Sequence, residues 1–76
     1  MVAEQRDSNG RLRVPYFINL IGDYMSTRST YNAAEFKLFV ERLGVLQTAD
    51  WEPESNGYTI WKHRVDRARQ KVFTDV

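Results

Sequence analysis

Apolar residues begin to recur at helical spacing after a polar start to the chain. Phe17, Leu20, Ile21 and Tyr24 stand at the i, i+3, i+4 and i+7 positions that form one face of an α-helix. Pro15 precedes them and suits the first turn of a helix, where its missing N–H costs nothing. We therefore predict a first helix that begins at Pro15.

A run of hydroxyl residues after this helix predicts a loop, and the clearest helix signals of the chain follow it. Asn32 is a favoured N-cap, and Glu35 stands three residues later to complete a capping box. Tyr31 and Phe36 hold the two positions of a hydrophobic staple. These signals predict a second helix over Ala33–Leu43. Gly44 follows it and is expected to end the helix.

The next segment predicts a loose β-hairpin. Val45 and Leu46 can start a strand, Asn56 followed by Gly57 is a strong hairpin-turn dipeptide, and residues 58–62 are rich in β-branched and aromatic types. The predicted pairing joins residues 45–49 to residues 58–62. Beyond them, helical spacing returns and predicts a last helix from His63, with its apolar positions at Val65, Ala68 and Val72.

The order of elements predicts a mainly α fold with a small β-hairpin, of the α+β class. A chain of 76 residues supports one hydrophobic core, so we expect a flexible N-terminal arm over residues 1–11 and a single small globular domain over residues 12–76. The succession of helix, helix, hairpin and helix resembles winged helix-turn-helix domains over about residues 15–62. The pattern that carries the resemblance is Phe36, Phe39, Val40, Leu43, Gly44, Val45 and Leu46.

Composition narrows the possible chemistry. The apolar fraction of 42% is too high for a disordered chain. The chain has no cysteine and a single histidine, His63, so thiolate chemistry and sulfur-based metal sites are excluded. No assembled catalytic triad is recognisable, and no apolar run is long enough to span a membrane. We expect a cytoplasmic protein without enzymatic activity, metal or cofactor.

Charge is distributed unevenly, although the net charge is only +1. Residues 31–57 carry a net charge of −3 and residues 58–76 a net charge of +3. On a helix, Arg64, Arg67 and Lys71 share one face, with Lys62 nearby, and such a stripe can neutralise phosphates. The alternative is a solvated helix face that keeps a small domain soluble.

The winged-helix resemblance implies a DNA-binding role. In helix-turn-helix proteins the start of the second helix and the turn before it enter the major groove. Arg28 and Asn32 have side chains able to read base edges, although the capping role already explains Asn32. The residues that the resemblance places toward the groove are Arg28, Ser29, Thr30, Asn32, Glu35 and Lys37.

The acidic stretch around Trp51 favours a different partner. Asp50, Glu52 and Glu54 lack the spacing of a calcium loop, so we expect a solvated acidic loop. At the tip of a wing these carboxylates would repel phosphates. Trp51 lies between two acids and is difficult to bury, which makes Trp51, Glu52 and Glu54 candidates for a protein contact.

Two functions are therefore open. The first is a small DNA-binding regulatory domain that uses Arg28, Ser29, Thr30 and Lys37 toward the groove and the basic residues of the last helix toward the phosphates. Its partner would be double-stranded DNA, bound by a homodimer or by one module of a larger assembly. The second is a protein-binding adaptor or inhibitor that presents the acidic Trp51 loop and the basic last helix to a partner protein.

Overall fold

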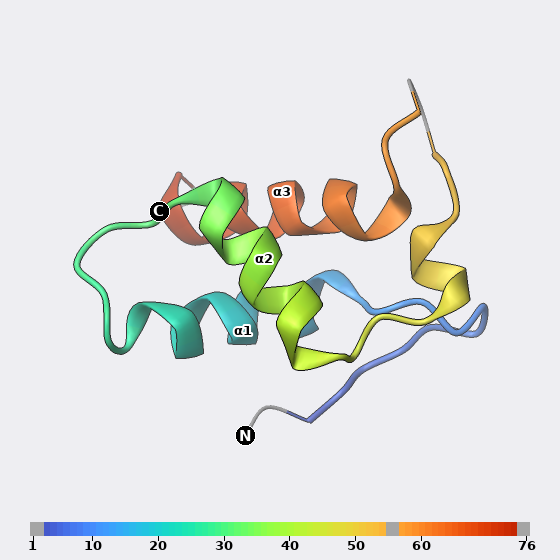
Figure 1. The fold of residues 1–76 in the computed structure, drawn as a ribbon, viewed down its shortest axis with the longest axis horizontal. Coiled ribbons are helices and arrows are strands. Elements are labelled where there is room, and N and C mark those ends of the chain that lie inside the picture. The colour runs from blue at the N-terminus through green and yellow to red at the C-terminus, as the bar shows by residue number, and fades with distance from the viewer. Residues whose placement is uncertain (1–2, 55–56, 75–76) are drawn as a thin grey trace.

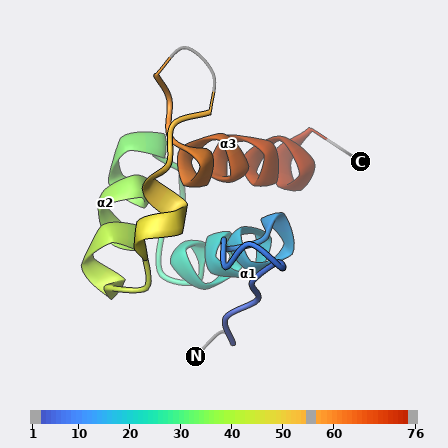
Figure 2. The same cartoon turned by 90° about the vertical axis from the view of Figure 1, so that its right-hand side faces the viewer.

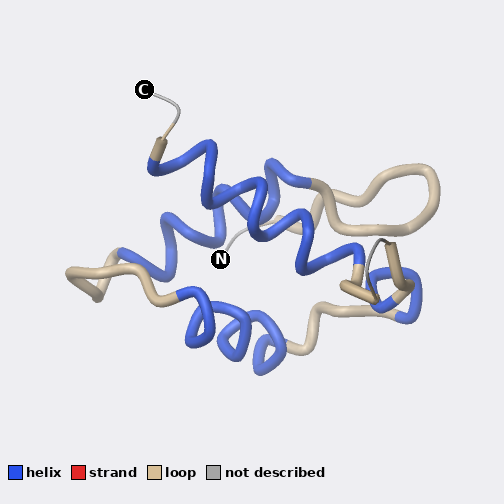
Figure 3. The backbone as a smooth tube through the Cα atoms, turned by 90° about the horizontal axis from the view of Figure 1, so that it is seen from above, coloured by secondary structure: helices blue, strands red, loops and turns tan. Residues whose placement is uncertain are grey.

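The computed structural model describes residues 3–54 and 57–74 and is built from helices. Three α-helices are joined by loops and one short 3-10 helix. In chain order the elements are α1 (Val14–Met25), α2 (Ala33–Leu43), the 3-10 helix η1 (Thr48–Trp51) and α3 (Ile60–Phe73). Helices α1 and α3 lie one above the other, and α2 packs against one side of this pair (Figures 1 and 2). Figure 3 shows helices and loops only, and no strand occurs among the residues described.

The core lies mainly between α1 and α3. Apolar faces of both helices meet there, and residues of α2 and of the N-terminal segment complete it. Burial of this apolar surface is the main favourable contribution to folding in a domain of this size. The buried cluster consists of Leu12, Tyr16, Phe17, Leu20, Ile21, Tyr24, Phe36, Val40, Trp61, Val65 and Ala68.

The first two predicted helices are confirmed, because local signals determine both. In α2 the Asn32 side chain accepts the Glu35 N–H at 2.9 Å, and the Tyr31 and Phe36 rings pack with centroids 5.7 Å apart. Gly44 ends the helix in the left-handed region with φ of 71°, which glycine adopts without a Cβ penalty.

The predicted hairpin is wrong, and the fold is all-α rather than α+β. The segment after Gly44 forms no strand. The Val45 carbonyl accepts a hydrogen bond from the Arg6 guanidinium, and the Gln47 N–H donates one to the Asp50 carboxylate. Their backbone groups are thus bound to side chains instead of a neighbouring strand. Two isolated antiparallel β-bridges close loops instead. One joins Arg6 to Leu12, and the other joins Pro53 to Thr59. Of the predicted turn, Gly57 has φ of 73°, and Asn56 lies outside the described residues.

The last helix begins at Ile60, three residues earlier than predicted. The β-branched and aromatic residues there suggest a strand by propensity, but Ile60 and Trp61 are buried with Val65 and Ala68. Packing against α1 outweighs local preference, as tertiary context commonly does. Residues 60–62 of the predicted second strand therefore lie in the first turn of α3.

Residues 5–13 form a loop that packs against the helices, and we call it the N-terminal loop. Its polar turn signature does make a turn: the Asp7 side chain accepts the N–H groups of Asn9 and Arg11, and Gly10 has φ of 77°. Leu12, at its end, is fully buried.

Asp50 joins this loop to the rest of the molecule. Its carboxylate is fully buried and accepts the Leu12 N–H at 2.8 Å, the Gln47 N–H at 2.9 Å and the Arg6 guanidinium at 3.0 Å. The expectation of a solvated acidic loop is thus wrong for Asp50. We call Asp50 and its three partners the Asp50 clamp.

Asp50→Ala should lower the free energy of unfolding by about 3 kcal/mol, because it leaves a part-buried guanidinium and two backbone N–H groups without their acceptor. Urea denaturation followed by circular dichroism measures the loss. Glu41→Ala, at an exposed acid of α2, is the control and should change stability by less than about 0.5 kcal/mol. Equal effects of the two substitutions would contradict the role of the clamp.

Candidate nucleic-acid interface

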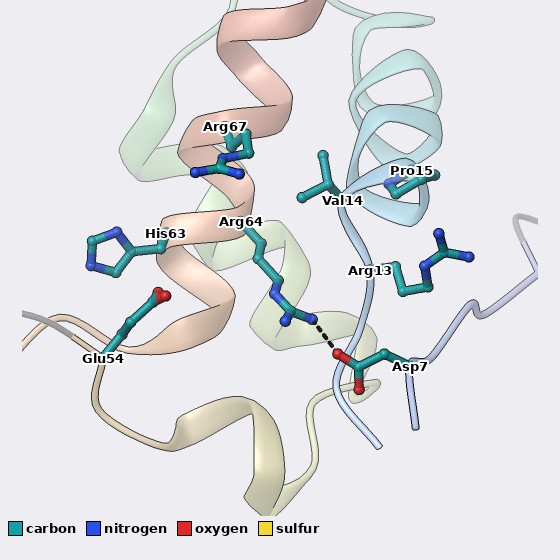
Figure 4. Close-up of a pocket in the computed structure, with 8 residues that line it drawn as sticks. All are labelled: Asp7, Arg13, Val14, Pro15, Glu54, His63, Arg64 and Arg67. Carbon is teal, nitrogen blue, oxygen red and sulfur yellow. Dashed lines mark hydrogen bonds and ion pairs between the residues drawn. The ribbon is translucent and has the colours of Figure 1, made fainter. Parts of the chain in front are cut away.

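A groove rich in basic residues lies between the start of α1 and the first half of α3 (Figure 4). Its volume is about 390 Å³. We call it the basic groove, and its lining residues are Asp7, Arg13, Val14, Pro15, Glu54, His63, Arg64 and Arg67.

Arg64 holds the two walls of the basic groove together. From α3 its Nη1 atom donates to Asp7 Oδ2 at 3.1 Å and to the Leu12 carbonyl at 2.8 Å, as Figure 4 shows for Asp7. The ion pair neutralises the Arg64 charge. Arg64 therefore orients the N-terminal loop, and Arg13 and Arg67 of the groove remain for a ligand.

The contacts of Asp7 also determine the charge state of its carboxyl group. Its pKa lies below the ordinary value of 3.8 because its carboxylate accepts the Arg11 N–H and, against the cost of partial desolvation, pairs with Arg64. Hydrogen bonds and a nearby cation both favour the ionised form. Asp7 thus stays charged at neutral pH and keeps Arg64 in place.

Three exposed cations follow one another along this side of the molecule. Arg13 and Arg67 line the basic groove, and Arg67 also lines a second hollow of about 380 Å³ with Lys71. Arg67 and Lys71 are four residues apart and share a face of α3. Arg13, Arg67 and Lys71 make no ion pair with any residue that the structure describes. We call these three residues the open cations.

The residues predicted to enter a DNA groove from the loop before α2 lie elsewhere. Arg28, Ser29 and Thr30 are exposed but follow the C-terminal end of α1, whereas the basic groove lies at its N-terminal end. Arg28 stacks over the Tyr24 ring at 4.1 Å from the centroid and donates to the Tyr24 carbonyl at 3.1 Å. The structure does not bring this loop together with Arg64 and Arg67.

Lys37 faces α3 rather than solvent. Its Nζ donates to the Tyr58 hydroxyl at 2.6 Å and lies 3.3 Å from Asp66. Burial by itself lowers the pKa of Lys37, but the Tyr58 hydrogen bond and the Asp66 charge outweigh it and raise the pKa. Lys37 thus joins α2 to α3. Lys62, at the start of α3, is half-buried and lies 5.7 Å from the Trp61 ring centroid.

The three predicted protein-contact residues have different surroundings. Trp51 is 44% exposed and packs edge-on against the buried Trp61, with centroids 5.6 Å apart. Glu52 pairs with Arg11, and Glu54 lines the basic groove. Trp51 is therefore exposed without a flanking pair of free acids.

Neither metal-binding nor membrane-spanning features occur in the described ranges, 3–54 and 57–74. No group of three or more His, Asp or Glu side chains is placed to hold a metal ion there, and no helix there is long and apolar enough to cross a bilayer. His63 packs edge-on against the Tyr58 ring at 4.8 Å.

Arg13 and Asp7 are the interface residues that the sequence did not indicate. Arg13 stands just before the predicted helix start at Pro15. A basic residue at that position could have indicated a site that binds an anion. Asp7 belongs to a polar turn, and nothing local links it to Arg64, which is 57 residues away.

Comparisons with known proteins add no relative. No family model, no curated protein and no solved structure matches the chain.

The Asp7–Arg64 contact should make stability depend on pH at the acid end. Because the folded-state pKa of Asp7 is lowered, its contribution is present above the unfolded value of about 3.8 and is lost as pH falls through the folded value. Thermal unfolding of the native chain and of Asp7→Asn should differ at neutral pH and converge as the pH falls below about 3.8. In an Arg64→Ala background this convergence should shrink without vanishing, since the Arg11 N–H remains. A difference independent of pH would contradict the assignment.

Proposed function

We propose that this chain is a small, non-catalytic regulatory domain that binds double-stranded DNA through its phosphate backbone. The observation that carries the proposal is the row of open cations, Arg13, Arg67 and Lys71, beside two adjoining hollows. Cations already paired within the protein gain little from a phosphate. Open cations release condensed counterions from DNA when they bind, and this release favours association.

The favoured DNA contact lies on α3 rather than on α2. Along α2 the acids Glu35 and Glu41 accompany Lys37 and Arg42, and Lys37 is bound to Tyr58 and Asp66. That helix offers no surplus of positive charge. The open cations lie on α3 and at the entry to α1, so the favoured contact is there.

Backbone contact also fits the kind of side chains involved. Arginine forms paired hydrogen bonds to phosphate oxygens, and lysine acts as a mobile point charge. Such contacts position a protein on DNA but do not read its sequence. We therefore expect weak binding with strong salt dependence and little preference among sequences.

Trp51 supports a second candidate function, contact with a partner protein. Its ring is 44% exposed yet held edge-on against Trp61, and a rigid exposed indole is a typical interface anchor. Trp51→Ala distinguishes the two functions, because it should leave DNA affinity unchanged.

Binding to random-sequence duplex DNA should weaken steeply with salt. Three phosphate contacts give a slope of about −2.7 in log affinity against log salt, which is a loss of about fortyfold between about 50 and about 200 mM salt. Arg67→Ala combined with Lys71→Ala should leave a slope of about −0.9, a loss of about fourfold. Fluorescence anisotropy measures both.

The matched control is Arg42→Ala combined with Arg69→Ala. It removes the same charge from α2 and from a different face of α3, and it should keep most of the slope. Equal effects of the two double substitutions would mean that binding depends only on the net charge of the protein. That result would contradict an interface formed by the open cations. No binding at low salt would overturn the proposal.

Asp7→Asn should strengthen DNA binding by about two- to fivefold, because it removes an acid from the basic groove and releases Arg64 from its ion pair. Asp23→Asn removes the same charge outside the groove and should give a smaller gain. Anisotropy at low salt measures both affinities, with thermal unfolding to verify the fold. A weaker complex with Asp7→Asn would contradict this account of the groove.

A further inference from the structure

A third hollow, of about 280 Å³, has a different character from the basic groove. The N-terminal segment, α1 and the end of α2 meet there. Tyr16 and Leu20, both nearly fully buried, line it, together with Val45, which is half-buried, and Leu43, which is 45% exposed. We call it the apolar hollow.

The charged residues that line the apolar hollow are both acids, Glu4 and Asp23. Glu4 Oε1 forms an ion pair with Arg6 Nε at 3.0 Å. The same guanidinium also pairs with the buried Asp50. Asp23 is exposed and makes no ion pair with any described residue. The rim is therefore negative, and it would repel the phosphates that the open cations attract.

The size of the hollow limits what it can hold. Pockets for small-molecule ligands usually enclose about 300–1,000 Å³, so this one lies just below that range. It is suited to one or two apolar side chains presented by a larger partner. Exposed Leu43 would lose its contact with water when such a side chain entered, and burying apolar surface favours binding.

We propose that the apolar hollow binds a short segment of a partner protein in which an aliphatic side chain is flanked by lysine or arginine. The aliphatic side chain enters between Leu43 and Leu20, and the basic neighbour pairs with Asp23 and Glu4. The contact is independent of the proposed DNA binding and uses neither Trp51 nor the basic groove. If both functions hold, the domain joins a basic protein segment to DNA.

The test is an NMR titration of the isotope-labelled full chain with three short capped peptides. The first has a leucine between lysines, the second replaces the leucine by serine, and the third replaces the lysines by glutamates. The first peptide should shift the amide signals around Leu20, Asp23, Leu43 and Val45 in a saturable way. The other two should bind at least about fivefold more weakly.

Two substitutions with matched controls locate the contact. Leu43→Ser should weaken the first peptide about tenfold, whereas Leu38→Ser, at an equally exposed leucine of α2 (49% exposed), should leave it unchanged. Asp23→Asn should weaken it about threefold, and Glu35→Gln should not. Arg67→Ala with Lys71→Ala should bind the peptide normally, which separates this site from the DNA interface.

Several results would overturn the proposal. They are the absence of shifts around the hollow with the leucine–lysine peptide, equal binding of the serine or glutamate peptide, and unchanged binding to Leu43→Ser. Thermal unfolding of each variant verifies that it is folded. Since the peptides contain no phosphate and the DNA titration contains no peptide, either proposal can fail while the other holds.

Discussion

The Asp50 clamp is the contact on which the arrangement of the domain depends. One buried carboxylate accepts hydrogen bonds from Leu12, Gln47 and Arg6, and these belong to the N-terminal loop and to the start of η1. A buried charge is costly unless it is paired and hydrogen-bonded. All three partners must therefore be present together, so the clamp requires one particular position of the N-terminal loop.

The segment that precedes α1 in turn contributes to both candidate binding surfaces. Asp7 reaches Arg64 on α3 because Leu12 is held in the core, and Arg13 then stands at the entry to α1, in the lining of the basic groove. Glu4 lines the apolar hollow together with Leu43 at the end of α2. The described residues before α1 thus contribute Asp7 and Arg13 to the basic groove and Glu4 to the apolar hollow.

The part of the fold that could be predicted is the part with local causes. Helix α2 follows from Asn32, the Tyr31–Phe36 pair and Gly44, each of which acts within a few residues. The predicted hairpin is wrong because residues 58–62 have strand-like side chains, but Ile60 and Trp61 belong to α3 and their side chains are buried. Of the predicted basic residues, Arg67 and Lys71 are open, while Lys37 is bound to Tyr58 and Asp66, and no spacing in the sequence shows that difference.

The sequence by itself determined two helices, the polar turn at the N-terminus and the basic character of the last helix. These depend on spacing, caps and charge along the chain. The tertiary structure alone decided that Asp50 is buried, that Arg64 is neutralised and that Arg13 joins Arg67 beside a groove. These three facts depend on contacts between residues 38 to 57 positions apart, and such contacts leave no periodicity in a sequence because only the packed core sets which distant residues meet.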